Sequence, residues 1–169
     1  MTLSGSTLIN LDAVGADQEY RIGLGLRPQY SYLNSTLSNA QFFGINVKGF
    51  FRRDDRWEIG IGMTPSFGYK MQFHRLEVEH VYNIGRFWDD PRWTIRTFTG
   101  FNLWVDNEAN IDRSGYLVGS SLGFRLPWNL GAGSMDVYGG GFYSGFTSQT
   151  SGWALELGVQ WTYATRREH

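Results

Sequence analysis

The sequence predicts an all-β protein whose strands close into an eight-stranded, antiparallel, up-and-down β-barrel with short loops. Apolar and polar residues alternate with a period of two over most of the chain, and turn-forming residues separate the alternating stretches. No apolar run approaches the roughly 18 residues of a membrane-spanning helix. The 169 residues fit one domain, and the absence of cysteine excludes disulfides, thiol nucleophiles and cysteine-ligated zinc.

The ends of the chain lack this alternation. Residues 1–17 carry no sustained period, so we expect an N-terminal arm or strap ahead of a barrel domain over residues 18–164. Met1–Gln18 has neither the basic start nor the apolar core of a signal peptide, and we expect the chain to begin at a cleaved mature end. Residues 165–169 are predicted to be a C-terminal tail that includes residues of a purification tag.

The strands differ in how strictly they alternate. Residues 20–32, 57–70 and 152–163 alternate without interruption, which no helical period fits. In the stretch 134–147 the run Gly139–Gly141 blurs the pattern, so we expect a bulge or bend there. The remaining strands are predicted over 43–52, 75–84, 93–105 and 115–126, with turns or loops at 33–40, 53–55, 89–91, 106–113, 129–131 and 147–152.

Alternation does not by itself tell which face meets water. The polar face carries many glycines, which weaken a water-facing strand but make room in a crowded interior. Aromatic residues gather toward the strand ends on the apolar face, as in the girdles of membrane barrels. The strands are also long enough to cross a bilayer, so we favour a transmembrane barrel with its apolar face outside. The alternative is a soluble lipocalin-like barrel that binds an apolar ligand inside.

The last strand resembles a known assembly signal. Glu156, Gly158, Trp161 and Tyr163 follow the order of the β-signal of outer-membrane barrels, although Ala164–His169 extend beyond the usual final aromatic residue. The whole span 18–163 is similar to the small outer-membrane barrels of the OmpX, OmpW and OmpA transmembrane-domain group. The resemblance implies a bacterial outer-membrane location with a periplasmic strap, contact with lipid and lipopolysaccharide, and insertion by the barrel-assembly machinery.

The polar face predicts a charged lumen. Because cations and carboxylates nearly balance and an unpaired buried ion costs several kcal/mol, we expect a salt-bridged, largely closed interior with a structural or accessory role. A narrow conduit for small ions is the alternative. The predicted lumen charges are Arg21, Arg27, Lys48, Arg52, Lys70, Arg75, Arg96 and Arg125, with Glu58, Glu77, Glu79, Asp106, Asp136 and Glu156.

The sequence predicts no catalytic residue, no metal site and no cofactor. Some eight-stranded barrels modify lipid A, and His74 near the third connection is the candidate, with Ser66, Asp106 or Ser114 as partners. A second histidine, in His80-Val81-Tyr82, lacks the serine of a His-x-Ser pair. Three histidines do not make a metal-ligand cluster.

The remaining predictions concern partners. A net charge of −1 argues against nucleic-acid binding, and the short loops argue against a loop-borne binding site. His80, Thr97 and Thr99 are polar residues on the apolar parity, where lipid disfavours them. We therefore expect an interaction seam there for a protein partner, as in a subunit of a larger envelope assembly.

Overall fold

The computed structural model describes residues 20–35, 39–53, 57–85, 90, 92–108, 111–130, 133–146 and 151–164. The predicted arm and tail lie outside them. No helix in these residues is long and apolar enough to span a membrane. The strands are β1 (Tyr20–Ser35), β2 (Asn39–Arg53), β3 (Trp57–Thr64), β4 (Ser66–Phe67), β5 (Met71–Asn83), β6 (Trp93–Asp106), β7 (Ile111–Leu130), β8 (Gly133–Phe146) and β9 (Ser151–Ala164).

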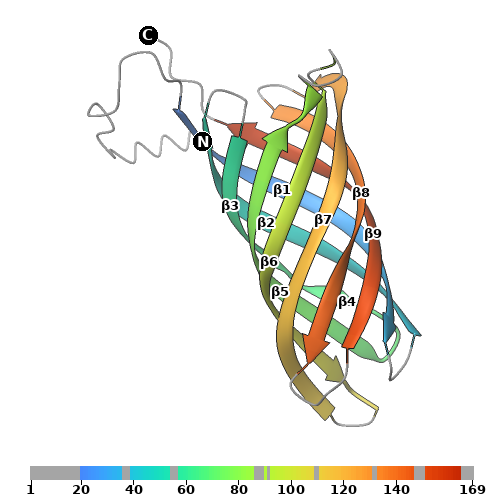
Figure 1. Cartoon of the computed structure of the whole chain (residues 1–169). Coiled ribbons are helices and arrows are strands. Elements are labelled where there is room, and N and C mark those ends of the chain that lie inside the picture. Colours follow the sequence, from blue (N-terminus) through green and yellow to red (C-terminus); the bar gives the residue numbers. More distant parts are fainter. Residues whose placement is uncertain are drawn as a thin grey trace, which may run out of the picture.

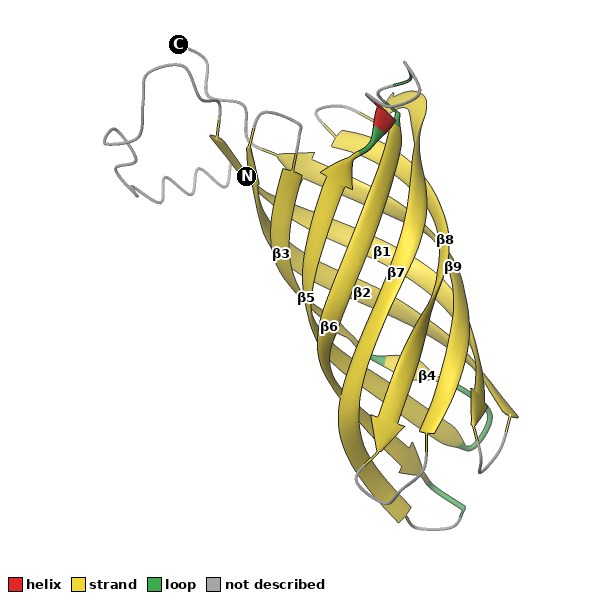
Figure 2. Cartoon of the chain, viewed as in Figure 1, coloured by secondary structure: helices red, strands yellow, loops and turns green. Residues whose placement is uncertain are grey.

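These strands form a closed, tilted, antiparallel barrel, which confirms the predicted fold (Figures 1 and 2). Each strand pairs with its neighbours in the sequence, and β1 closes the wall by pairing with both β2 and β9. Following paired residues once around the wall from Ala40 leads back to β2 at Phe50, ten residues further along. This stagger requires the strands to tilt against the barrel axis.

The predicted third strand is interrupted at Pro65, which separates β3 from β4. Proline has no N–H to donate to a neighbouring strand, so the ladder breaks at this residue. Both β3 and β4 pair with β2 and β5, so together they serve as one of eight wall strands. The connection that follows β4 holds Lys70 at a φ of 59°, a left-handed conformation that a residue with a Cβ adopts at a cost.

The bulge predicted at Gly139–Gly141 is not there. These glycines pair in unbroken register with Ser120–Leu122 of β7, because a glycine keeps both of its backbone hydrogen-bonding groups. The register shifts instead within β7, between Arg125 and Asn129. That interval contains Pro127, which cannot donate to the ladder.

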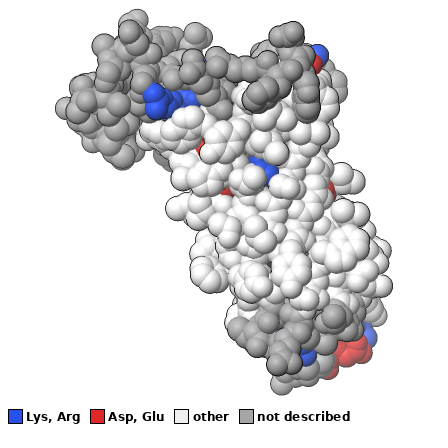
Figure 3. Space-filling model, in the orientation of Figure 1, with Lys and Arg blue, Asp and Glu red and all other residues white. Residues whose placement is uncertain are grey.

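The two faces of the wall have the predicted orientation. In β2, exposed and buried residues alternate along the strand. The outward Phe43 and Val47 are 58% and 51% exposed, whereas the inward Asn46 and Lys48 are at most 1% exposed. The space-filling view shows a broad uncharged outer wall with charges gathered mainly toward its ends (Figure 3). An apolar outside around a polar inside excludes the lipocalin-like alternative.

Aromatic side chains occupy both ends of this outer face. At the end where β1 begins and β9 ends, Trp93 packs edge-on against Phe124 at 4.9 Å, and Trp161 stacks on Tyr163 at 6.2 Å. At the other end, the ring of Tyr116 lies 6.3 Å from that of Tyr143. The zone between is mostly aliphatic, which is the arrangement of girdles around a hydrocarbon band.

Candidate functional site

The middle of the lumen holds a connected network of buried charges. Period-two alternation turns every second side chain inward, so strands that are distant in sequence present their charges to the same narrow space. The members are Arg27 from β1, Lys48 and Arg52 from β2, Glu58 from β3, Arg75, Glu77 and Glu79 from β5, Arg96 from β6, and Glu156 from β9.

Glu79 lies at the centre of this network and is fully buried. Its carboxylate contacts the guanidinium of Arg27 at 2.5 Å, the ammonium of Lys48 at 3.1 Å and the guanidinium of Arg96 at 3.2 Å. Three cations from three strands therefore meet at one carboxylate of a fourth strand.

The other carboxylates extend the network in both directions. Glu58 accepts from Lys48 at 2.5 Å and from Arg52 at 2.7 Å. Glu156 pairs with Arg75 at 2.8 Å and with Arg96. The charged residues of the network come from six of the eight wall strands, and Ser121 of β7, which accepts a hydrogen bond from Arg96 at 2.8 Å, adds a seventh.

Glu77 and neutral groups complete the contacts. Arg27 donates to Glu77 at 2.5 Å, and the amide of Asn46 donates to the same carboxylate at 2.9 Å. The guanidinium of Arg27 also lies 5.3 Å from the ring centre of Tyr138, within cation–π range. Each of the nine buried charges of the network has at least one ion-pair partner, which limits the cost of taking them out of water.

Lumen glycines make room for inward side chains, as predicted, and their neighbours include aromatic residues and Lys48. A Cβ on Gly25 would lie 3.0 Å from the Lys48 side chain, and one on Gly60 would lie 3.2 Å from Cβ of Phe50. A Cβ on Gly119 would lie closer still to the Phe98 and Phe142 side chains.

Five predicted lumen charges stand apart from the network, among them Asp106, which is half-buried at the end of β6. Lys70 was wrongly placed in the lumen: it lies in the connection after β4, where its ammonium pairs at 2.8 Å with Glu108 and is 44% exposed. The strand ends before this residue, so the period that predicted it no longer applies. Arg125 and Asp136 pair with each other at 3.2 Å on β7 and β8, partly exposed, and Arg21 is half-buried near the start of β1.

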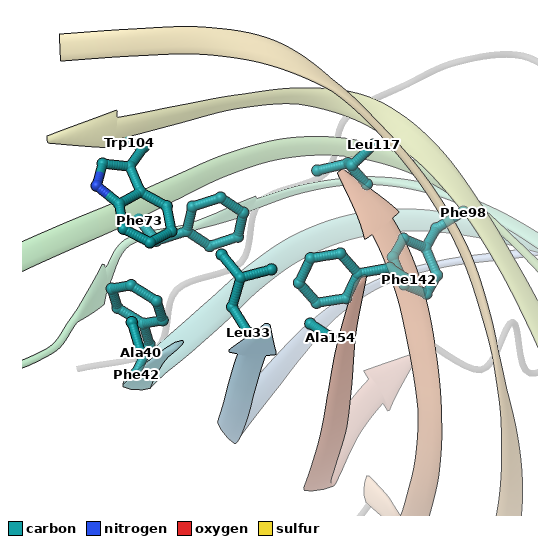
Figure 4. Packing of buried hydrophobic residues seen from close by; sticks show 9 residues of the cluster. All are labelled: Leu33, Ala40, Phe42, Phe73, Phe98, Trp104, Leu117, Phe142 and Ala154. Carbon is teal, nitrogen blue, oxygen red and sulfur yellow. The ribbon is translucent and has the colours of Figure 1, made fainter. Parts of the chain in front are cut away.

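Sequence reasoning missed an aromatic cluster in the lumen. Phe73 stacks on Phe142 at 5.9 Å and lies 5.5 Å from Phe42, and the Trp104 ring meets Phe42 edge-on at 5.6 Å (Figure 4). These aromatic rings are at most 3% exposed. One feature of the sequence could have revealed the cluster: its aromatic residues stand at positions that alternation assigns to the polar, inward face. Phe42, for example, directly precedes the outward Phe43. The full cluster is Leu33, Ala40, Phe42, Phe73, Phe98, Trp104, Leu117, Phe142 and Ala154.

This cluster, which we call the aromatic plug, fills one end of the lumen. Leu33 lies near the end of β1, Phe42 near the start of β2 and Trp104 near the end of β6. These positions belong to the barrel end opposite the start of β1 and the end of β9. The guanidinium of Arg75 lies 4.8 Å from the ring centre of Phe142, so charge network and plug are in contact.

The histidines lie on the outer wall. His74 was expected beside a connection, but it sits within β5 and points outward, 3.0 Å from the Gln72 side chain and edge-on to Phe67. Its candidate partner Ser66 is buried on the inward face, so the two side chains point to opposite sides of the wall.

The other candidate partners of His74 are also too far for proton transfer. Ser114 is two strands away, because His74 pairs with Leu103 and Leu103 pairs with Ser114. Two strand spacings amount to about 9–10 Å. Asp106, at the end of β6, pairs in register with Met71, which lies three residues or about 10 Å from His74 along β5. The described residues therefore do not assemble the histidine, serine and carboxylate proposed for a lipid A-modifying site, and they contain no cluster of three potential metal ligands.

The predicted seam residues do share the outer face. His80 of β5 pairs with Thr97 of β6, and both threonines, Thr97 and Thr99, are exposed. The structure adds Ser120 of β7, which is exposed and pairs with Thr97.

The residues of the predicted assembly signal divide between the two faces. Glu156 belongs to the charge network, Gly158 faces Tyr138 of the lumen too closely for a Cβ, and Trp161 and Tyr163 stack on the outer wall. The assembly role itself stays a prediction.

Fold and faces together define a class: the chain has the fold of the small eight-stranded outer-membrane β-barrels. Neisserial surface protein A (NspA) is similar over 82% of this chain and 95% of its own, with a TM-score of 0.60 and 13% identity. Ail, the attachment invasion locus protein of Yersinia pestis, is similar over 86% of this chain and 99% of its own, with a TM-score of 0.54 and 11% identity. No family model and no curated protein matches the sequence. At these identities the likeness establishes the fold alone.

Proposed function

We propose that this protein is a resident β-barrel of the Gram-negative bacterial outer membrane whose lumen is closed, with a structural or accessory role in the cell envelope. Lipid and lipopolysaccharide are its surroundings, and the barrel-assembly machinery inserts it through the signal in β9. The observation that carries the proposal is the filling of the lumen: a buried charge network in the middle and the aromatic plug at one end.

The space left inside supports a closed lumen over a porin-like conduit. Between Arg96, Asp136 and Gln160, on the side of the network away from the plug, lies a cleft of about 30 Å³. Such a volume admits about one or two water molecules. An ion entering from this side would meet paired charges and then the aromatic plug, neither of which offers it a hydrated path.

Conductance tests the closed lumen directly. The protein, refolded in detergent and inserted into a planar bilayer, should give no steady current, while heat-modifiable migration on SDS gels confirms that the barrel is folded. Reproducible single-channel steps from the folded protein would overturn the closed-lumen proposal and favour the conduit.

Removing the plug supplies the positive control for insertion. Because the charge network also closes the lumen, the variant combines Phe73→Ala and Phe142→Ala in the plug with Arg75→Ala and Glu156→Ala in the network, and we expect transient ion passage from it. Phe43→Ala combined with Phe101→Ala, which removes side chains from the outer wall alone, should stay silent.

A second candidate function, a subunit of a larger envelope assembly, is favoured by one observation. Hydroxyl groups of Thr97, Thr99 and Ser120 lie on the outer face within its otherwise aliphatic zone. Lipid tails offer them no hydrogen bonds, whereas a protein partner would. Co-purification of an envelope protein with the wild type, lost in a Thr97→Val, Thr99→Val, Ser120→Ala variant, tests this role; retention of the protein by the variant would contradict it.

A further inference from the structure

In the middle of the outer wall, polar residues of neighbouring strands form a continuous row. Across β5 to β8, His80 pairs with Thr97, Thr97 with Ser120 and Ser120 with Gly141. Thr99 lies beside this row on β6. We call these five residues the outer seam. It combines groups that form hydrogen bonds with a residue that has no side chain, which is the composition of close contacts between proteins in membranes.

A shallow, open depression of about 450 Å³ lies next to the seam, over β7, β8 and β9. Ser120 and Gly141 are among the residues that line it, and the small side chain of one and the missing side chain of the other leave space beside Tyr143 and Leu155. Val118, Tyr143 and Leu155 stand around it, and all three are exposed.

A projecting side chain lies on the other side of Val118. Phe101 of β6 is 71% exposed, more than the outward Leu103 on the same strand at 40%. Phe101 is displaced from Thr99 toward the plug end of the barrel, and the depression is displaced from Ser120 in the same direction. Projection and depression therefore lie at a similar depth in the wall, with β7 between them.

We propose that the outer seam is the interface of a homodimer, in which two copies pack about a two-fold axis that runs parallel to the barrel axes near Val118. Rotation about such an axis leaves the depth of each residue in the membrane unchanged and places the β6 side of one copy opposite the β8 side of the other. Phe101 of each copy therefore enters the depression of the other. The inference rests on the proposed membrane location, because both copies must share one bilayer orientation.

A second copy accounts for features that lipid leaves without a partner. An acyl chain fills a depression but gives hydroxyl groups nothing to bond. Hydroxyls both donate and accept, so a surface of threonine and serine is complementary to itself. Thr99 already donates to the carbonyl of Leu117 at 3.2 Å and keeps its acceptor capacity for a partner.

Cysteine cross-linking in a bilayer tests the interface without interference, since the chain has no native cysteine. Val118→Cys places one thiol per copy beside the axis, where motion of the two copies brings the Cα atoms to the roughly 4–7 Å of a disulfide far more often than at positions away from the interface. Ile45→Cys is the matched control, because this residue is similarly exposed and lies on β2 in the opposite part of the wall. After reconstitution in phosphatidylcholine vesicles and mild oxidation, Val118→Cys should give the disulfide dimer and Ile45→Cys should not.

Second-site variants then examine the fit. Adding Phe101→Ala or Ser120→Trp to Val118→Cys should lower the dimer association constant by about tenfold, because one removes the projection and the other fills the depression. Phe43→Ala, an exposed phenylalanine on β2, should leave cross-linking unchanged.

The outcomes separate the dimer from the membrane location. Equal cross-linking at positions 118 and 45, or none at either in protein that floats with the vesicles and migrates as a folded barrel, overturns the dimer and leaves the membrane barrel standing. Folded protein that does not float with the vesicles overturns the proposed location and the dimer with it.

Discussion

Replacing Glu79 by glutamine removes the central negative charge of the lumen while keeping the size of the side chain. Arg27, Lys48 and Arg96 all lie within 3.2 Å of this carboxylate, at positions at most 5% exposed. Removing one partner of a buried ion pair costs about 3–5 kcal/mol, because the remaining charge stays out of water. Each of the three cations retains another carboxylate, so we expect the free energy of unfolding to fall by about 3 kcal/mol, the lower end of this range.

The loss is measured as the free energy of unfolding in urea, followed by tryptophan fluorescence of the barrel refolded in phosphatidylcholine vesicles. Glu108→Gln is the control, because its ion pair with Lys70 has side chains 70% and 44% exposed and should change stability by less than about 1 kcal/mol. Combining Glu79→Gln with Lys48→Met should cost less than the sum of the single changes, since Lys48 contacts Glu79 directly. If Glu79→Gln costs no more than Glu108→Gln, the lumen charges are hydrated and the account of a closed network is wrong.

The remaining predictions concern the plug, a close approach and a strained connection. Phe73→Ala should lower the free energy of unfolding by about 3–5 kcal/mol because it leaves a cavity in the plug. Phe43→Ala on the outer face leaves no cavity and loses only the transfer of the ring from water into lipid, so it should cost about 1–2 kcal/mol. Equal losses would show that the plug is not packed. Gly119→Ala should cost about 1–3 kcal/mol because its Cβ would meet Phe98, Phe142 and a backbone oxygen, and Gly49→Ala, which meets nothing within 4 Å, should cost nothing; a stable Gly119→Ala would contradict the packing. Lys70→Gly should be more stable than Lys70→Ala by about 1 kcal/mol, since only glycine adopts a φ of 59° without strain, and equal urea midpoints would argue against that conformation.

The barrel was predictable because its signal repeats on every strand. Alternation along one strand determines which residues share a face. The glycines on the polar face and the aromatic residues on the apolar face then indicate that the polar face is inside and the apolar face outside. Local exceptions were harder. Pro65 interrupts a strand and Pro127 lies where the register of β7 shifts, because neither has an N–H group, whereas the more conspicuous Gly139–Gly141 keeps regular pairing.

The lumen was predictable in composition and not in arrangement. Parity identified the charges, but which carboxylate meets which cation depends on the ten-residue stagger of the closed wall. The aromatic plug was missed because Phe42, Phe98 and Trp104 are aromatic residues on the polar parity, each beside aromatic or apolar neighbours. The depression beside the outer seam depends on Gly141 and Leu155 of adjacent strands, a juxtaposition that no local pattern reveals.

The central claim is that the outer face meets lipid and that the middle of the inner face is closed to lipid and to bulk water. Single cysteines test it, with Ile45→Cys and Leu157→Cys outside and the isosteric Ser31→Cys and Ser144→Cys inside, in protein reconstituted in vesicles. We predict that a water-soluble maleimide labels none of the four before unfolding, and that a lipid-soluble maleimide labels only the outer pair. Water-soluble labelling of the inner pair would show an open lumen, and water-soluble labelling of the outer pair would show a barrel outside the membrane; either result would contradict the account.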